Sequence, residues 1–191
     1  MNVQSKAGAL VATAAILLAV QSALAVDVKV DFEKSVDFKS LRTWGWNPNG
    51  PGEVRMGRTP DDDPDQMRKR VEPVIVDAVT TGMRERGLEF AANSPDVFVT
   101  YFLLLSTSSS AQTIGQFLGP HVWSVPPFLA STQSLEVMNQ GSLLLDVSAK
   151  GQIVWRGLAD AKIKTDADMK RREAVLREAV RDLLRKYPKR S

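Results

Sequence analysis

The chain has 191 residues and a net charge of +3 at pH 7, with one histidine and no cysteine. Without cysteine it can form no disulfide and use no thiol in catalysis, and a zinc site of nitrogen and sulfur ligands cannot be assembled. The small positive excess predicts no nucleic-acid partner, and we expect neither a metal nor a cofactor.

The first 25 residues predict a secretory signal. One lysine, Lys6, precedes the apolar run Ala7–Val20, and Ala23-Leu24-Ala25 has the small-x-small pattern of a signal peptidase site. The run is short for a transmembrane helix, which needs about 20 apolar residues. We therefore expect cleavage after Ala25 and a periplasmic or secreted protein, residues 26–191, with no lipid-anchor cysteine and no integral membrane span. A retained N-terminal anchor is the alternative.

The next segment predicts two strands and a loop. Val26–Phe32 alternates apolar and charged side chains, which is typical of a half-buried strand, and Leu41–Trp46 predicts a second strand. Asn47–Asp63 contains three glycines and three prolines among mostly polar residues, so it predicts a loop.

A helix is expected after this loop, with Asp63 as its N-cap and Pro64 at its first position. It should end at Gly87 in the C′ position, where Leu88 can make the apolar contact of such caps. Pro73 interrupts the pattern because proline removes a backbone hydrogen bond, so we expect a kink there or a helix that begins at Pro73.

The central part alternates strands with one long irregular segment. Asp96–Leu105 predicts a strand, Ser106–Ser134 has no sustained period and predicts a loop, and Leu135–Val147 predicts another strand with a possible break near Gly141. Its expected partner is Ile153–Ile163, across a turn at residues 149–152.

The final helix is predicted over Ala167–Tyr187, capped by Thr165 or Asp166 and stopped by Pro188. Five or six strands and two helices with hairpin connections predict a single α+β domain. We expect a largely antiparallel sheet with both helices packed on one face.

Several short motifs of residues 26–191 are similar to those of one bacterial family. They are Asp31-Phe32, Asp37-Phe38, the strand Thr43–Trp46, Pro95-Asp96-Val97, Leu145-Asp146 and the segment Val154-Trp155-Arg156-Gly157. Together they resemble the domain of unknown function 4136 family over essentially all of this part of the chain. The resemblance implies a small exported envelope protein; many members are predicted lipoproteins, but this chain lacks the lipid-anchor cysteine. No activity defines the family, so it supplies no catalytic residues.

The middle loop is the first candidate binding region because it carries aromatic and apolar side chains without a regular period. These are Phe117, Leu118, His121, Val122, Trp123, Phe128 and Leu129. Exposed, such residues form an interaction site; alternatively they pack the loop against the open face of the sheet. We select Phe117, His121, Trp123 and Phe128 as candidate binding residues, and interpret His121 as solvated rather than catalytic.

Arg156 is the fifth candidate binding residue. In an antiparallel strand Trp155 and Arg156 point to opposite faces, so we expect Trp155 beneath the final helix and Arg156 on the open face near Asp146. Gly157 would permit a bulge or a close approach of the helix. An alternative is a carboxylate-based, metal-independent hydrolase that uses Asp146 and Asp160 with Arg156.

Two charged clusters have plain structural interpretations. The acidic run Asp61–Asp65 suits the start of a helix better than a calcium loop, because it lacks calcium-loop spacing. Lys170, Arg177, Arg181 and Arg185 form one stripe of the last helix, with Glu173 and Asp182 available as local partners. Contact of this stripe with an anionic surface is the alternative.

The sequence therefore predicts an exported envelope protein that is a non-enzymatic binding or structural accessory module. No catalytic residues are predicted, and the expected partner is another envelope protein or a polysaccharide.

Overall fold

The computed structural model describes residues 26–56, 63–105, 112–113, 136–137, 141–161 and 168–189. Its strands and helices follow in chain order as β1 (Val26–Phe32), β2 (Thr43–Trp46), β3 (Gly52–Met56), α1 (Pro64–Glu85), β4 (Glu89–Phe90), β5 (Val97–Leu105), β6 (Gln112–Thr113), β7 (Glu136–Val137), β8 (Ser142–Ala149), β9 (Gln152–Ala161) and α4 (Met169–Arg185).

The main sheet has seven strands in the order β1-β9-β8-β5-β2-β4, and β3 also pairs with β5. β1, β9, β8 and β5 are antiparallel neighbours, whereas β2, β3 and β4 join the sheet by parallel pairing. The α+β class is confirmed, but the sheet is mixed rather than largely antiparallel. Parallel neighbours need a long crossover, and α1 provides it because it separates β2 and β3 from β4 and β5 in the chain.

β3 corrects the prediction of a continuous loop over Asn47–Asp63. It pairs with the second half of β5, while β2 pairs with the first half. Its Val54 is buried, and a Cβ at Gly52 would clash with the backbone of Tyr101, so glycine is needed for this close approach. Sequence periodicity missed the strand because it is short, begins with glycine and depends on a partner that follows α1.

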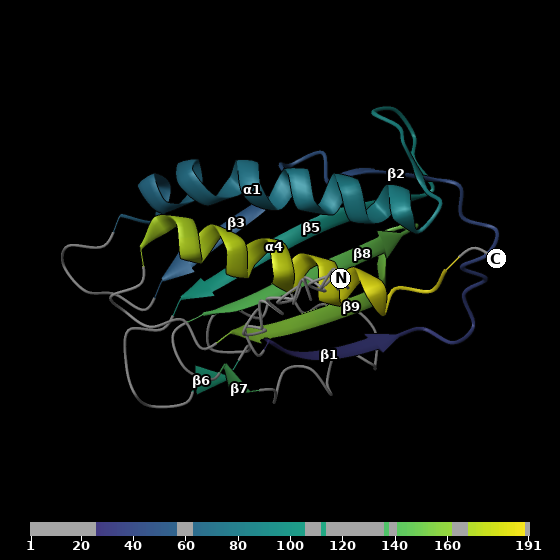
Figure 1. Ribbon diagram of the computed structural model, residues 1–191. Coiled ribbons are helices and arrows are strands. Elements are labelled where there is room, and N and C mark those ends of the chain that lie inside the picture. Colours follow the sequence, from purple (N-terminus) through teal and green to yellow (C-terminus); the bar gives the residue numbers. More distant parts are fainter. Residues whose placement is uncertain are drawn as a thin grey trace, which may run out of the picture.

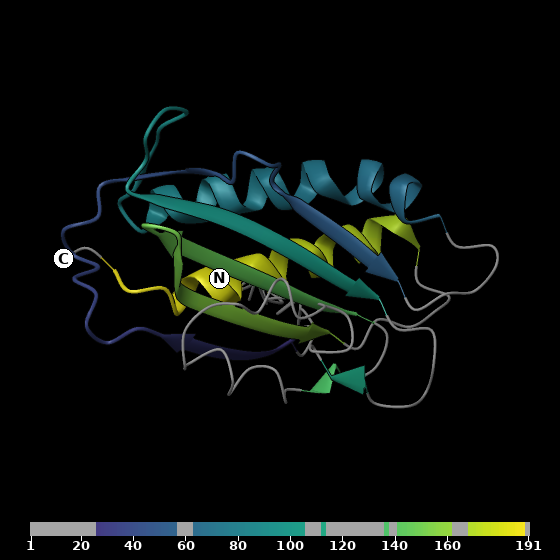
Figure 2. The same ribbon diagram turned by 180° about the vertical axis from the view of Figure 1, so that it is seen from behind.

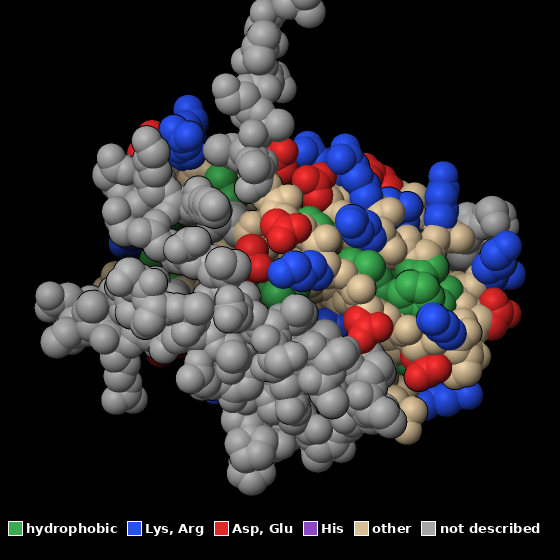
Figure 3. Space-filling model, turned by 90° about the horizontal axis from the view of Figure 1, so that it is seen from below, with side chains coloured by type: hydrophobic (Ala, Val, Ile, Leu, Met, Phe, Trp, Pro, Cys, Tyr) green, Lys and Arg blue, Asp and Glu red, His purple; other side chains and the backbone are tan. Residues whose placement is uncertain are grey.

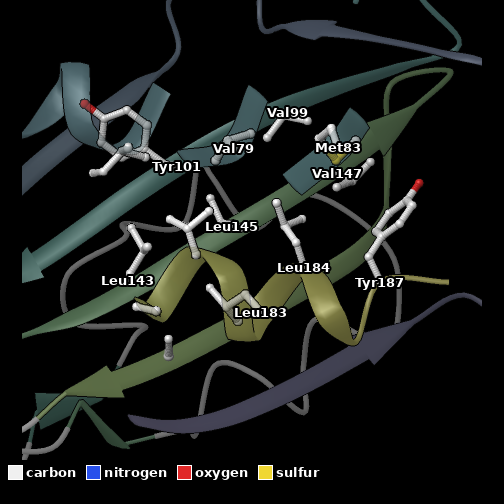
Figure 4. Packing of buried hydrophobic residues seen from close by; sticks show 14 of the residues in the cluster. Val79, Met83, Val99, Tyr101, Leu143, Leu145, Val147, Leu183, Leu184 and Tyr187 are labelled. Carbon is white, nitrogen blue, oxygen red and sulfur yellow. The ribbon is translucent and has the colours of Figure 1, made fainter. Parts of the chain in front are cut away.

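The two described helices, α1 and α4, lie side by side over one face of the sheet (Figure 1). The core fills the space between them and the strands (Figure 4). It includes Val79 and Met83 from α1, Val99, Tyr101, Leu143, Leu145 and Val147 from the sheet, and Leu183, Leu184 and Tyr187 at the end of the chain. Each of these helices thus buries one apolar stripe, as the sequence predicts.

The ends of α1 follow the prediction. The Asp63 side chain accepts hydrogen bonds from the backbone N–H groups of Asp65 and Gln66. At the other end Leu88 is buried and its N–H donates to the carbonyl of Met83 at 3.1 Å, which closes the predicted C-cap. The helix continues through Pro73, so the alternative that it begins there is wrong.

The C-terminal half differs from the prediction mainly at element ends. α4 begins at Met169, because Asp168 caps it by accepting from the N–H of Arg171 at 2.8 Å; Thr165 and Asp166 lie outside the described residues. The turn between β8 and β9 falls at Lys150 and Gly151, as expected. The strand predicted over Leu135–Val147 is divided near Gly141, since β7 pairs with β6 in a separate sheet and β8 begins at Ser142.

Candidate functional site

The candidate site is the face of the main sheet that α1 and α4 leave uncovered (Figure 2). Successive side chains of a strand point to opposite faces, so this face is formed by the residues that alternate with the core. Trp155 belongs to the core under the helices and Arg156 to the opposite face. The prediction that these two side chains point to opposite faces is therefore correct.

Four polar residues lie opposite one another across four strands on this face. We call them the polar row: Asp31 of β1, Arg156 of β9, Asp146 of β8 and Thr100 of β5. The side-chain amide of Asn47 donates to the hydroxyl of Thr100 at 3.2 Å and extends the row past β5.

Arg156 and Asp146 form a buried, two-point ion pair at the centre of the row. Nε of Arg156 donates to Oδ1 of Asp146 at 2.6 Å, and Nη2 donates to Oδ2. Only 1% of Arg156 and 5% of Asp146 are exposed. The predicted proximity is confirmed, but Arg156 is buried rather than presented on an open face. Both carboxylate oxygens are engaged, so the pair stabilises the β8–β9 hairpin and cancels its own charge.

Apolar side chains lie beside the polar row. Phe102, Leu144 and Leu158 occupy the adjacent positions of β5, β8 and β9, and Leu104 follows Phe102 two residues along β5. All four are buried, although none belongs to the core beneath the helices. This face therefore combines a neutral ion pair with apolar side chains that are covered in this structure.

A second polar pair joins β8 and β9 farther along the same face. The hydroxyl of Ser142 donates to Oδ1 of Asp160, which lies opposite Asp27 of β1. Burial raises the pKa of Asp160, and the hydrogen bond from Ser142 partly opposes that shift. Ser142 has no exposed surface, so a substrate cannot reach its hydroxyl in this conformation.

On the helix side, Trp155 and Gly157 have the packing roles expected of them. Trp155 is fully buried and its ring centroid lies 5.5 Å from that of Tyr187, in an edge-to-face arrangement. A Cβ at Gly157 would lie 2.7 Å from Leu183 of α4 and would clash with the Trp155 ring. The glycine permits close helix packing; the irregularity of the hairpin lies elsewhere, between Val147 and Ser148.

The other candidate binding residues, Phe117, His121, Trp123 and Phe128, lie outside the described residues and stay predictions. Asp61 and Asp62 also lie outside them, and Asp63 serves as a helix cap. Within the described parts of the chain, no group of three or more His, Cys, Asp or Glu side chains could hold a metal ion. Neither helix in those parts has the length and apolar character to cross a bilayer.

The basic stripe of α4 is largely paired with acidic residues. Arg177 pairs with Asp77 of α1, Arg181 with Glu178 at 3.2 Å, and Arg185 with Asp182 at 3.0 Å. These three arginines are paired, as predicted, but of the two expected acidic partners only Asp182 takes part, and Glu173 is replaced by Asp77 as the partner of Arg177. Periodicity within one helix could not identify Asp77, because the packing of α1 against α4 brings it near Arg177.

Sequence reasoning missed Asp96, which joins the start of β5 to β2. One oxygen of its carboxylate accepts from the backbone N–H groups of Arg42 at 2.7 Å and Thr43 at 2.8 Å. These bonds lower the pKa of Asp96. Thr100 and Asp31 were missed as members of the polar row; their alternation along the strands was visible, but which strands are neighbours was not.

A family comparison identifies the chain. The model of the family described as Domain of unknown function (DUF4136) matches residues 28–189. The chain belongs to the DUF4136 family. The resemblance inferred from the short motifs is thereby confirmed. No curated protein matches this DUF4136 chain.

One solved structure of the family has a similar fold. A DUF4136 family protein from Bacteroides thetaiotaomicron is similar with a TM-score of 0.53 and 17% identity, over 87% of this chain and 97% of that chain. A PDZ domain protein from Parabacteroides distasonis gives a TM-score of 0.46 and 12% identity, over 85% of this chain and 36% of that chain. A PelC dodecamer from Paraburkholderia phytofirmans gives a TM-score of 0.38 and 8% identity, over 84% of this chain and 96% of that chain.

Proposed function

We propose that this DUF4136 protein is an exported accessory protein of the cell envelope that binds another envelope component and catalyses no reaction. The binding surface would consist of the segment that connects β5 to β8 and the exposed residues beside it on this sheet face, since the side chains around the polar row are buried. The observation that carries the proposal is the ion pair of Arg156 with Asp146, because it occupies both oxygens of one carboxylate that a hydrolase of this face would need.

Export is supported by the sequence of residues 1–25, which has the charge, apolar run and small-residue site of a cleaved leader. N-terminal sequencing of protein from cell fractions tests this part. We expect the purified protein to begin at Val26 and to fractionate with the periplasm or the medium. A chain that begins at Met1 in the cytosol would contradict it.

A carboxylate-based hydrolase is the second candidate, since burial raises the pKa of Asp160 and a general acid needs such a shift. That mechanism also needs a second available carboxyl group. Asp146, the second carboxyl group expected from the sequence, has both oxygens bound to Arg156. We therefore favour the binding role. An Asp160→Asn variant that abolishes hydrolysis of a cell-wall polymer would reverse this choice.

Site-specific photocrosslinking in intact cells tests the binding role directly. The double variant Trp123→Ser, Phe128→Ser removes two of the candidate binding side chains from the segment between β5 and β8. The matched control is Phe90→Ser, which removes an exposed aromatic ring from β4, the strand at the opposite edge of the sheet from β1. We expect one crosslinked partner, identified by mass spectrometry, with the wild type and the control.

The double variant should lose this partner while its urea unfolding curve stays the same as that of the wild type. The same partner recovered in equal amount from all three proteins would contradict a binding role for this segment.

A further inference from the structure

β1 forms one edge of the main sheet in the part of the chain that the structure describes. Among the described residues only β9 pairs with β1. The N–H of Glu33, just past β1, donates to the carbonyl of Val154 at 2.9 Å. Because backbone groups alternate in direction along a strand, the odd-numbered residues 27, 29, 31 and 33 point their N–H and C=O groups toward β9. The backbone groups of Val28, Val30 and Phe32 therefore point outward, where another strand could bind them.

The side chains of β1 repeat almost symmetrically along the strand. Val26, Val28 and Val30 pack against the core, and charged residues alternate with them. Phe32, at the end of the strand, is 39% exposed and makes an edge-to-face contact with Phe38. The side chains of Lys29 and Asp27 are 46% and 70% exposed, and Nζ of Lys29 lies 3.9 Å from Oδ2 of Asp27. Such an exposed ion pair is weak, so either side chain can pair with a charge of a partner instead.

Seen from the side of β1, the described surface carries interspersed acidic and basic side chains and an apolar patch toward one end (Figure 3). A partner that binds here must therefore place charges of both signs and an apolar side chain along one strand. A second β1 has this composition.

We propose that a second copy of this chain binds antiparallel to β1, so that the two sheets become one continuous sheet. In the proposed register Val30 faces Val30 of the second copy, and Lys29 faces Asp31 of the second copy. Val28 then faces Phe32 of the second copy, which covers the exposed ring. The outward backbone groups of residues 28, 30 and 32 pair with those of the other strand.

Charge excludes one neighbouring register, and the position of Phe32 decides against the other. If Lys29 faced Lys29 of the second copy, Asp27 would face Asp31, and like charges directly opposite are destabilising. A register centred on Val28 would pair Asp27 with Lys29 but would leave Phe32 beyond the paired residues. The Val30 register opposes Lys29 to Asp31 and also covers Phe32; its one unfavourable opposition is that of Asp27 with Glu33, which follows β1.

Disulfide trapping tests the register, and it is free of background because the chain has no cysteine. Opposed residues of a hydrogen-bonded antiparallel pair have Cα atoms about 5.5 Å apart, within the range that a disulfide spans. We compare Val28→Cys, Lys29→Cys and Val30→Cys with the control Phe90→Cys, whose exposed site lies on β4, at the opposite edge of the sheet.

Val30→Cys should form the covalent dimer fastest, well above the rate of the Phe90→Cys control. A maximum at Val28 or Lys29, or rates that nowhere exceed the control, would overturn the proposal.

Sedimentation equilibrium of the purified protein tests the association itself. Lys29→Asp places an aspartate opposite Asp31 of the second copy at both ends of the interface, so we expect the dimer Kd to rise about tenfold. Lys39→Asp makes the same charge change at an exposed lysine outside β1 and should leave the Kd unchanged. A wild type that stays monomeric up to about 1 mM, or a Kd that Lys29→Asp does not alter, would refute the dimer.

Discussion

Replacing one partner of the ion pair between Asp146 and Arg156 should destabilise the protein strongly. Asp146→Leu leaves a guanidinium that is 1% exposed without its carboxylate, and Arg156→Met leaves a carboxylate that is 5% exposed without its cation. Two charge-assisted hydrogen bonds disappear in either variant, each worth about 1.5–3 kcal/mol. We therefore expect each single substitution to lower the free energy of unfolding by about 3–5 kcal/mol, the usual cost of breaking a buried pair.

The double variant should be close to the wild type. With both charges gone, leucine and methionine lie beside Leu144 and Leu158 on the same face, and no buried charge needs compensation. Such replacements of buried ion pairs are often neutral or stabilising. Because the double variant loses almost nothing, the double-mutant cycle should give a coupling energy close to the sum of the two single losses, about 6 kcal/mol or more.

Urea unfolding followed by tryptophan fluorescence measures these differences, with the m-value checked for each variant so that the free energies stay comparable. Two results would refute the reasoning. One is a single variant whose free energy of unfolding falls by less than about 1 kcal/mol. The other is a double variant whose loss equals the sum of the two single losses, because the two side chains would then act independently.

Further substitutions test the packing and the caps. Gly157→Ala should lose about 1–3 kcal/mol, because its Cβ overlaps Trp155 and Leu183; Gly141→Ala, whose Cβ would contact its nearest neighbour at 3.4 Å, is the matched control and should change stability far less in the same urea assay. Asp63→Ala removes the N-cap of α1 and should cost about 0.5–2 kcal/mol, read from thermal unfolding. Because hydrogen bonds lower the pKa of Asp96 below its ordinary 3.8, its carboxylate stabilises the fold above that pH and loses this effect as the pH falls further. The stability difference between the wild type and Asp96→Asn should therefore be constant at neutral pH and shrink on acidification below about pH 4; a difference that grows would contradict the assignment.

The parts of the fold that depend on neighbouring residues could be predicted from the sequence. The strand over Val26–Phe32, the caps of α1 and the β8–β9 turn each follow from a pattern within a few residues. β3 could not be predicted in this way. Its pairing partner, β5, follows a helix and a further strand in the chain, and its glycine is needed because the Tyr101 backbone lies close to it.

The candidate site shows the same division. A hairpin with a defined turn places Asp146 opposite Arg156, so their proximity could be inferred from the sequence. The burial of the pair, and its continuation to Thr100 and Asp31, depend on which strands flank the hairpin. The neighbours of a strand are set by tertiary packing and not by its own periodicity.

By itself the sequence determined the class of fold, the family, and the residues that alternate between the two faces of each strand, because local hydrogen bonding and hydrophobic periodicity are properties of contiguous residues. Only the tertiary structure decided that β2 and β3 pair with β5 and β4 with β2 in parallel, that α4 pairs through Arg177 with α1, and that β1 is left at the edge of the sheet. These features arise when distant segments bury their apolar surfaces together, and that choice depends on the whole chain.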